Sequence, residues 1–288
     1  MDTTVNIKRI IPAETVPEGA GVTVYRTIGA PALRNYDPFL LLDHISSDNP
    51  DDYAAGFPSH PHRGFSTFTY MIDGYMQHKD SMGNHGNMEP GSAQWMKAGS
   101  GIVHSEMPKQ KNGLMRGFQL WINLPAAHKM DHPEYQEFSS DAFPLVETPD
   151  YLVKVLIGSF GNANAPIADD LTEVIYLDVT VKPGKRFYHM LPDGCRGFIY
   201  VFEGMGQSNV ENIPVHSLAI FDGVNHIIDF TAGPDGARLV VASGKPIEEP
   251  IVRHGPFVMN TREQIDQAVR DYQSNDFVRN RAWVKRNQ

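Results

Sequence analysis

Glycine and proline interrupt this chain throughout its length, and they constrain its fold more than any other feature. The 288 residues include 25 glycines and 21 prolines. Between them lie short runs of β-branched and aromatic residues, the pattern of an all-β sandwich or barrel. We therefore predict an all-β fold. The length allows either one large domain or two of ordinary size.

The β pattern is expected to occur in two blocks. Residues 65–80 predict a β-hairpin, because alternating residues lead to Asp73-Gly74, a type I′ turn pair, and a second run follows. Residues 125–150 are rich in proline and acidic side chains and predict a linker or long loop. The chain is thus predicted to contain two tandem β domains, over residues 1–134 and 135–288. Other strands are predicted at 93–99, 101–107, 114–125, 151–160, 172–181, 197–204, 216–223, 226–233 and 237–244.

One helix is predicted near the end of the sequence. Thr261 can cap it, and Gln264 stands three residues later in position for a capping box. Apolar residues at helical spacing follow, so this helix is expected to pack against the rest of the fold. The residues of its predicted apolar face are Ile265, Ala268, Val269 and Tyr272.

Charge and cysteine content narrow the class of protein. The formal net charge of −9 argues against direct nucleic-acid binding, which needs a basic surface. Cys195 is the one cysteine, so no internal disulfide can form, and this suits a reducing compartment. The first residues lack the apolar region of a secretory signal, and no apolar run approaches the roughly 20 residues of a membrane span. We expect a cytoplasmic protein with no membrane contact.

Histidine is the residue type that points to a site. The chain has 12 histidines, most of them before residue 135. His60 and His62 are spaced i, i+2, which on a strand aims both side chains at the same face. Pro61 between them cannot donate to a strand ladder, so this segment is predicted at a sheet edge or a strand start. Alone, such a pair is more often incidental than functional.

A second pair at the same spacing strengthens the interpretation of the first pair as part of a metal site. His104 and Glu106 would also share one face of a strand. Two such pairs on neighbouring strands would bring together three nitrogen ligands and one oxygen ligand. That set suits a divalent transition metal such as iron, manganese, nickel, copper or zinc, with two positions open on a six-coordinate ion. Two unrelated pairs remain the alternative.

The other reactive side chains are expected to be structural. His78 and His85 are interpreted as loop histidines, with support of a metal ligand as the alternative. Cys195 has no histidine beside it and is not expected to act as a nucleophile. The methionines of the first half are expected to fill the core. Histidines without a partner at useful spacing are His44, His128, His132, His189, His216, His226 and His254.

Four long motifs resemble the pirin family of bicupins. They are HPHRGFSTFTYMIDG, HKDSMGNHG, EPGSAQWMKAGSGIVHSEMP and SGKPIEEPIVRHGPFVMNT. The resemblance implies two tandem cupin barrels (double-stranded β-helix, or jelly-roll, folds) with a short C-terminal helix. It implies one metal in the N-terminal barrel, Fe²⁺ by preference, with Mn, Ni, Cu, Co or Zn as alternatives. The family's ligands correspond to His60, His62, His104 and Glu106. The second half has no matching set and is expected to hold no metal.

The resemblance also implies two classes of function. One is a quercetin 2,3-dioxygenase, which opens the ring of a flavonol with release of CO and uses Glu106 as its catalytic base. The alternative is a metal- or redox-sensitive regulator acting through protein partners, as a transcriptional co-regulator or a modulator of a metabolic enzyme. We expect a monomer with a small aromatic substrate. Ser66 stands where many members of the family have a glutamate. That glutamate is not one of the four ligands, so the expected metal site is unaffected, but the polarity near residue 66 is expected to differ.

Overall fold

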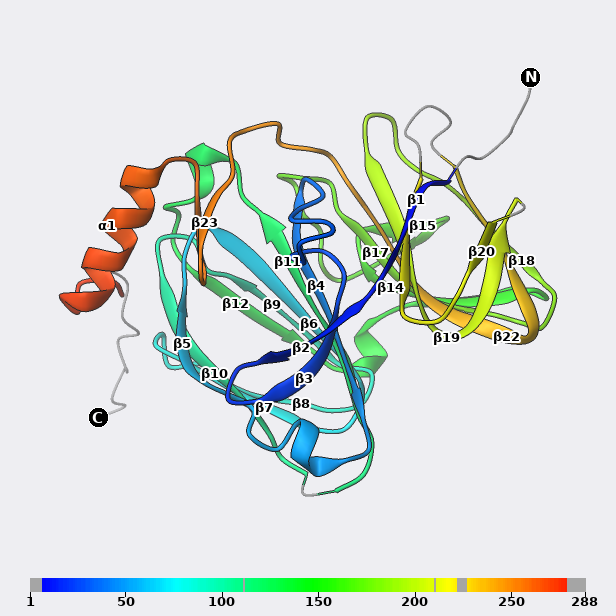
Figure 1. The fold of residues 1–288 in the computed structure, drawn as a ribbon, viewed down its shortest axis with the longest axis horizontal. Coiled ribbons are helices and arrows are strands. Elements are labelled where there is room, and N and C mark those ends of the chain that lie inside the picture. Colours follow the sequence, from blue (N-terminus) through cyan, green and yellow to red (C-terminus); the bar gives the residue numbers. More distant parts are fainter. Residues whose placement is uncertain (1–6, 111, 210, 222–226, 279–288) are drawn as a thin grey trace. The chain divides into compact units, whose positions relative to one another are not determined.

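The computed structural model describes residues 7–110, 112–209, 211–221 and 227–278. Two compact units emerge, here called the first and the second unit. The first unit takes in residues 15–28, 39–140 and those from 247 onward, and the second takes in residues up to 14, 29–38 and 141–246. Both units are built mainly of antiparallel strands (Figure 1), so the predicted all-β class is confirmed. The predicted single division between residues 134 and 135 stays a prediction.

The first unit contains two antiparallel sheets. The larger, seven-stranded sheet has the order β12 (Glu134–Phe138), β9 (Ala93–Lys97), β6 (Phe65–Asp73), β11 (Met115–Asn123), β4 (Phe39–Ser47), β3 (Val22–Arg26) and β2 (Glu14–Glu18). The smaller sheet has the order β5 (Phe57–His62), β10 (Ile102–Pro108), β7 (Met76–Asp80) and β8 (His85–Met88). A short 3₁₀ turn, Pro50–Asp52, precedes β5. Met71, Met76, Met88 and Met115 are buried in one core cluster with Val22, Val24, Ile45 and Tyr53, which confirms the expected packing role of these methionines.

The predicted hairpin over residues 65–80 is wrong. β6 pairs with β9 and β11, whereas β7 pairs with β8 and β10. The turn at Asp73-Gly74 therefore carries the chain from one sheet to the other. Gly74 has φ +88°, and a Cβ built there would lie 2.5 Å from Gln110 Oε1. Glycine is required at this crossing, so the turn signal was correct but not the pairing inferred from it.

The predicted linker over residues 125–150 is also wrong in part. It contains β12, which pairs with β9, and β13 (Leu145–Glu147), which pairs with β14 (Tyr151–Ile157) of the second unit. Two 3₁₀ turns, Ala126–His128 and Ser140–Ala142, complete it. β12 and β13 lie at the ends of their sheets. Edge strands with one side in water tolerate polar and acidic residues, so composition alone resembled a loop.

The last part of the first unit comes from the end of the described chain. β23 (Val252–His254) and β24 (Phe257–Met259) form a small hairpin, and α1 (Arg262–Gln273) lies beside it (Figure 1). The Thr261–Gln264 capping box is present, as predicted. Ile265 and Ala268 are buried, but Tyr272 is 44% exposed. Asp271, and not Tyr272, is buried on this helix, where it pairs with the buried Arg63.

The second unit consists of a strongly bent nine-stranded antiparallel sheet and the separate two-stranded sheet β15–β16. β22 (Ile227–Gly244) covers both strands predicted over residues 226–244 without a break; residues 222–226 lie outside the described part. Its first half pairs with β18 and its second half with β17 and β19, so one strand joins two faces around a core that includes Leu177, Ile199 and Val241. The remaining strands are β1 (Ile7–Pro12), β15 (Ser159–Phe160), β16 (Ala163–Asn164), β17 (Ile175–Val181), β18 (Arg186–Met190), β19 (Arg196–Ser208), β20 (Glu211–Ile213) and β21 (Ser217–Phe221).

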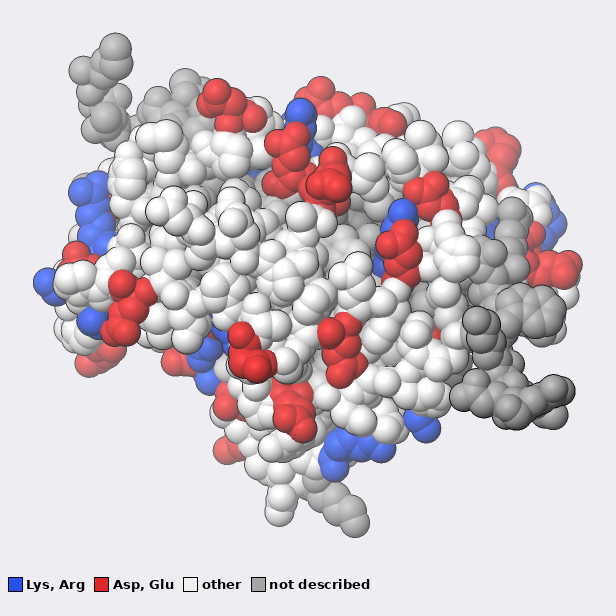
Figure 2. All heavy atoms as spheres, turned by 180° about the vertical axis from the view of Figure 1, so that it is seen from behind, with Lys and Arg blue, Asp and Glu red and all other residues white. Residues whose placement is uncertain are grey.

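The surface agrees with the acidic composition. On the face shown in Figure 2, Asp and Glu side chains are scattered widely, and Lys and Arg occur singly or in small groups between them. Among the residues described on this face, basic side chains form no extended stripe of the kind that binds a phosphate backbone. No helix in the described part of the chain has the length and apolarity that crossing a membrane requires.

Candidate metal centre

Two neighbouring strands of the smaller sheet carry the four predicted ligands. His104 of β10 lies opposite His60 of β5 in the antiparallel register, and Ile102 lies opposite His62. β5 is the outer strand of its sheet, so the missing N–H of Pro61 breaks no ladder, and the predicted edge position is confirmed. The register is irregular between His104 and Glu106. An irregularity of this kind re-aims a side chain, and here it lies just before Glu106.

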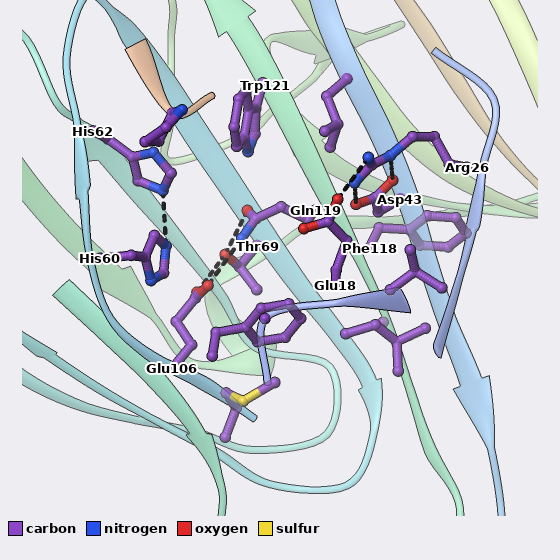
Figure 3. Close-up of a pocket in the computed structure, with 18 of the residues that line it drawn as sticks. Glu18, Arg26, Asp43, His60, His62, Thr69, Glu106, Phe118, Gln119 and Trp121 are labelled. Carbon is purple, nitrogen blue, oxygen red and sulfur yellow. Dashed lines mark hydrogen bonds and ion pairs between the residues drawn. The ribbon is translucent and has the colours of Figure 1, made fainter. Parts of the chain in front are cut away.

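Three imidazoles converge at one point. His60 Nε2 and His62 Nε2 are 3.0 Å apart, and Figure 3 shows them facing each other. The ring centroid of His104 lies 4.4 Å from that of His60 and 4.9 Å from that of His62. The candidate ligand atoms of the three residues all lie within 4.8 Å of one another. Metal–nitrogen bonds are about 2.1 Å long, so a single ion can bridge ring nitrogens at such separations.

Glu106 belongs to a second, overlapping group. Its carboxylate lies within 4.8 Å of the ligand atoms of His104 and His78, which also lie within that distance of each other. The four predicted residues therefore fall into two groups that share His104. Within the described residues, both groups lie in the first unit.

The protonation of the buried imidazoles suits metal binding. His62 is 2% exposed and His104 is 1% exposed. Burial, and then the charge of the neighbouring imidazoles, holds the pKa of both groups well below the usual histidine value. Neutral imidazole is the form that binds metals. His104 Nε2 is buried and has no hydrogen-bond partner among the described residues, so an ion could take up its lone pair.

A chain of polar groups behind His104 explains why Nε2 is free. His104 Nδ1 lies 3.4 Å from His78 Nδ1, and His78 Nε2 lies 3.4 Å from Asp80 Oδ2. Burial disfavours the charge of Asp80, but the hydrogen bonds from His78 and Asn84 outweigh it and lower the pKa of Asp80. An ionised Asp80 accepts from His78 Nε2, so His78 Nδ1 accepts from His104 Nδ1 and His104 Nε2 carries no proton.

The two histidines between the predicted pairs have different roles. His78 is fully buried in β7 and stacks on Tyr135 with ring centroids 4.5 Å apart. The interpretation of His78 as a loop histidine is therefore wrong, and the alternative of a residue that supports a ligand fits its position. His85 is exposed on β8 and takes no part in the cluster. It serves below as a matched control.

Glu106 is held by three side chains that the sequence did not single out. Its Oε1 accepts hydrogen bonds from Thr69 Oγ1 at 3.0 Å and Gln94 Nε2 at 2.5 Å. Its Oε2 accepts from Gln119 Nε2 at 2.9 Å. Figure 3 shows Thr69 and Gln119 reaching Glu106 from the larger sheet. An ionised carboxylate, which only accepts, satisfies all three donors at once.

These three residues form part of one cross-strand row. Thr69 of β6 lies opposite Gln94 of β9 on one side and Gln119 of β11 on the other. The row continues from Gln119 to Asp43 of β4 and from Asp43 to Arg26 of β3. For Thr69, Gln94 and Gln119, the signal in the sequence is a single polar residue between two apolar neighbours. It could not have identified the row, because its members meet only through the register of the sheet.

Thr69, Gln119, Asp43 and Arg26 of this row line a cavity between the two sheets of the first unit. The cavity has a volume of about 540 Å³ and largely apolar walls that include Phe57, Met71, Met76, Phe118 and Trp121. Figure 3 shows His60, His62 and Glu106 at one end and Arg26, Asp43 and Glu18 at the other. A volume of this size lies within the range of small-molecule sites, about 300–1,000 Å³.

The end remote from the imidazoles is a closed ion-pair cluster. Arg26 donates to both carboxylate oxygens of Asp43, at 2.7 and 2.5 Å, and its third nitrogen lies 2.7 Å from Glu18. Burial disfavours the charge of Arg26, but the hydrogen bonds and the charge of Asp43 outweigh it and raise the pKa of Arg26. Arg26 is therefore a cation already balanced by two carboxylates.

The loop after His62 is fastened by the C-terminal part of the chain. Arg63 is buried, donates to Asp271 Oδ2 at 2.7 Å and to Ser100 O at 2.7 Å, and lies 4.4 Å from the ring centroid of Phe277. Lys129 is 1% exposed. Its Nζ donates to Gly64 O at 2.8 Å and Val258 O at 3.1 Å, and to Asn123 Oδ1. Two buried cations thus join the ligand strand to β24 and α1.

The burial of Lys129 predicts that the stability of the fold depends on pH. Burial lowers the pKa of Lys129 from its ordinary value of 10.5 to about 8. Between these values the unfolded chain binds the proton and the folded protein does not, so stability should rise with pH from about 8 to 10.5. Below pH 8 both states are protonated and the cost of burying the charge is constant. The rise has an upper limit of about 3 kcal/mol.

Urea unfolding at pH 7.5 and pH 10 measures this rise. Other groups titrate in the same range, so the comparison is with Lys129→Met, in which the increase should shrink. The absolute stability of that variant is not diagnostic, because it leaves carbonyl groups unpaired. An equal rise in both proteins would show that Lys129 is not the group responsible.

Two further residues noted in the sequence lie away from the cluster. Ser66 is 1% exposed, and its Oγ has no hydrogen-bond partner among the described residues. Thr69 and Met71 line the cavity, so the two-residue period of β6 places Ser66 on the opposite face of the sheet. Cys195 is buried in the second unit, and burial raises the pKa of its thiol. That keeps it protonated and poorly nucleophilic.

Comparison with known proteins extends over most of the chain. A family model described as Pirin matches residues 21–122, and one described as Pirin C-terminal cupin domain matches residues 176–278. A Pseudomonas aeruginosa protein named "Putative quercetin 2,3-dioxygenase" is 47% identical over 264 residues, which cover 88% of this chain and 92% of that protein. A pirin-like protein of Caulobacter vibrioides is 44% identical over 275 residues, covering 94% and 98%.

A solved structure supports the same architecture. The crystal structure of quercetin 2,3-dioxygenase from Acinetobacter baumannii matches with a TM-score of 0.87 at 28% identity, over 95% of this chain and 98% of that one. The prediction of two cupin domains with one helix near the C-terminus is confirmed by this match and by the two family models.

Proposed function

The chain belongs to the pirin family, and from this premise we propose that it is a metal-dependent dioxygenase of flavonols, of the quercetin 2,3-dioxygenase type. One observation carries the proposal. Three imidazoles converge, and two of them, His60 and His62, line one end of a largely apolar cavity of about 540 Å³ together with the hydrogen-bonded carboxylate of Glu106. Such a cavity can accept a flat aromatic molecule and present one edge of it to a metal.

In this proposal His60, His62, His104 and Glu106 hold one divalent ion, Fe²⁺ by preference. The residues fit such an ion, because the buried His104 Nε2 has no hydrogen-bond partner among the described residues and the three imidazoles supply nitrogen donors. Mn, Ni, Cu, Co and Zn suit the same donor set. When bound, the ion supplies Lewis acidity that lowers the pKa of a coordinated substrate hydroxyl.

Glu106 is the proposed base for that hydroxyl. The proton of the flavonol 3-hydroxyl passes to the carboxylate of Glu106, which faces the cavity. Once protonated, Glu106 needs an acceptor where it had a donor. A flip of the Gln119 amide, which now donates from Nε2 at 2.9 Å, would turn its Oε1 toward the new O–H. Gln119 therefore allows both protonation states of Glu106.

The remaining lining residues orient the substrate and exclude water. Phe118, Met71 and Met76 supply apolar surface for the aromatic rings. The overall reaction adds both atoms of O₂ to the flavonol and removes one carbon as CO, leaving an ester of two aromatic acids. Shielding the ionised substrate from bulk water favours attack by O₂ over simple reprotonation.

Aerobic incubation of quercetin with the metal-loaded protein tests the proposal. Loss of flavonol absorbance and release of CO are expected. Glu106→Gln should lower kcat by about 10²- to 10⁴-fold, the usual contribution of a general base, while the three imidazoles retain the metal. Glu211→Gln, which changes an exposed carboxylate of β20, is the matched control and should keep full turnover.

Each departure from these results has a definite meaning. Full turnover by Glu106→Gln would show that Glu106 is not the base. Absence of turnover by the wild type with metal bound would refute the dioxygenase proposal. That result would favour the alternative function, a regulator whose metal state is sensed by a protein partner. Affinity capture with the metal-loaded and metal-free forms would then be used to find the partner.

A further inference from the structure

One charged residue of the cavity has no role in the site described so far. Arg253 belongs to β23 and is exposed at the rim, where it lines the same cavity as the imidazoles. Its guanidinium lies 4.7 Å from the ring centroid of Trp121. Trp121 is fixed in turn by Phe65, at 4.3 Å, and by His62, at 5.1 Å. Trp121 thus contacts a proposed metal ligand, His62, edge-on and also contacts this arginine.

The two arginines of the cavity differ in their charge balance. Arg26 is paired with both Asp43 and Glu18. Arg253 has no carboxylate within 4.0 Å in the part of the chain that the structure describes. Its hydrogen bonds go to the carbonyl oxygens of Gly255 and Leu40 and are long, at 3.3 and 3.4 Å. A guanidinium has five N–H donors, so most of those of Arg253 remain free for a ligand.

The charge environment of Arg253 also favours binding of an anion. Desolvation by the cavity wall, and then the positive charge of Arg26, lowers the pKa of Arg253, and the charges of Asp43 and Glu18 do not cancel this shift. A cation destabilised by its surroundings gains from a nearby anion. Stacking on Trp121 also orients the guanidinium before any ligand arrives, so less side-chain entropy is lost on binding.

We propose that Arg253 determines substrate specificity, and that the preferred substrate is an aromatic molecule carrying an anionic oxygen, a carboxylate or phenolate, away from the ring that meets the imidazoles. This inference rests on the proposed function of the same cavity. The reacting ring lies at His60, His62 and Glu106, and the anionic group lies at the rim over Trp121. Charge-assisted hydrogen bonds to Arg hold it there.

Two matched probes test this inference. 3-Hydroxyflavone and its 4′-carboxylate share the reacting ring and differ in one anionic group. In the metal-loaded wild type, kcat/KM should favour the carboxylate by roughly 10- to 100-fold, as expected for a charge-assisted hydrogen bond. In Arg253→Gln the ratio should fall to about 1. The wild-type preference should also weaken at high salt, because the arginine is exposed.

Two variants sharpen the comparison. Arg262→Gln removes an exposed arginine of α1 whose side chain is 65% exposed, and it should keep the wild-type ratio. Arg253→Lys keeps the charge but loses the planar fork and the stacking, so its ratio should be intermediate. Metal content, measured for every variant, identifies any protein that has failed to fold.

Anaerobic titration calorimetry with the same probes separates this inference from the dioxygenase proposal. Tighter binding of the carboxylate by the wild type and not by Arg253→Gln would support the role of Arg253 even if neither probe is turned over. Equal dissociation constants for the two probes in the wild type would overturn it, whatever the turnover. So would an unchanged preference in Arg253→Gln.

Discussion

Replacing His104 with alanine is expected to remove metal binding and turnover together. His104 is the residue shared by both candidate ligand groups, and its buried Nε2 has no hydrogen-bond partner within the described part of the chain. Loss of a residue that merely supports a ligand typically weakens metal affinity by about 10- to 100-fold. Loss of a ligand should therefore exceed that range. Metal content after dialysis and competition with a chelator measure the effect.

Variants of two other histidines provide reference values for the loss of metal affinity. His78→Leu breaks the chain from Asp80 to His104 and should weaken metal binding by about 10- to 100-fold, with the metal restored at high concentration. His85→Ala changes an exposed residue of β8 and should have no effect. Equal metal affinity in the wild type and His104→Ala would refute the ligand set.

Replacing Arg63 with methionine is expected to destabilise the first unit by about 3–5 kcal/mol. The side chain of Arg63 is 2% exposed, and that of its partner Asp271 is 9% exposed. The variant leaves Asp271 as a buried carboxylate without its arginine partner, although Gln267 Nε2 still donates to it at 2.6 Å. It also leaves Ser100 O without the donor it has now. Uncompensated buried charge of this kind is among the most destabilising changes known.

Tryptophan fluorescence during urea unfolding is the suitable measurement. Trp95 and Trp121 belong to the first unit and no tryptophan occurs in residues 141–246, so the signal reports on the first unit. Arg262→Gln breaks an exposed i, i+4 pair with Asp266 on the same helix and should change stability by at most about 0.5 kcal/mol. The double variant Arg63→Met/Asp271→Leu should recover part of the loss, because it removes both charges. A shift as small as that of the control would show that the pair does not fasten this unit.

Local spacing predicted the residues whose geometry depends on one strand or one helix. The two-residue period of a strand was enough to put His60 with His62 and His104 with Glu106. Pro61 identified the edge position of β5, and Thr261 with Gln264 identified the start of α1. In each case the side chains lie within a few residues of one another, so no knowledge of the tertiary fold was needed.

Features that depend on distant pairing were not predictable from the same patterns. Thr69, Gln94 and Gln119 hold Glu106 only because three strands align them in register. The turn at Asp73-Gly74 has the local chemistry of a hairpin, yet its strands pair elsewhere. Arg63 meets Asp271 from 208 positions away. The division of the chain at residue 134 and its monomeric state stay predictions.

The contribution of the C-terminal segment to the first unit has a consequence for biosynthesis. A ribosome has made all four proposed ligands by Glu106, but it reaches Asp271 only after the whole of residues 141–246. At about 5–20 residues per second, that delay is roughly 10–30 s. During this time Arg63 and the rim of the cavity lack their partners. The loop that follows β5 therefore completes its packing only after the C-terminal segment of the first unit has been made.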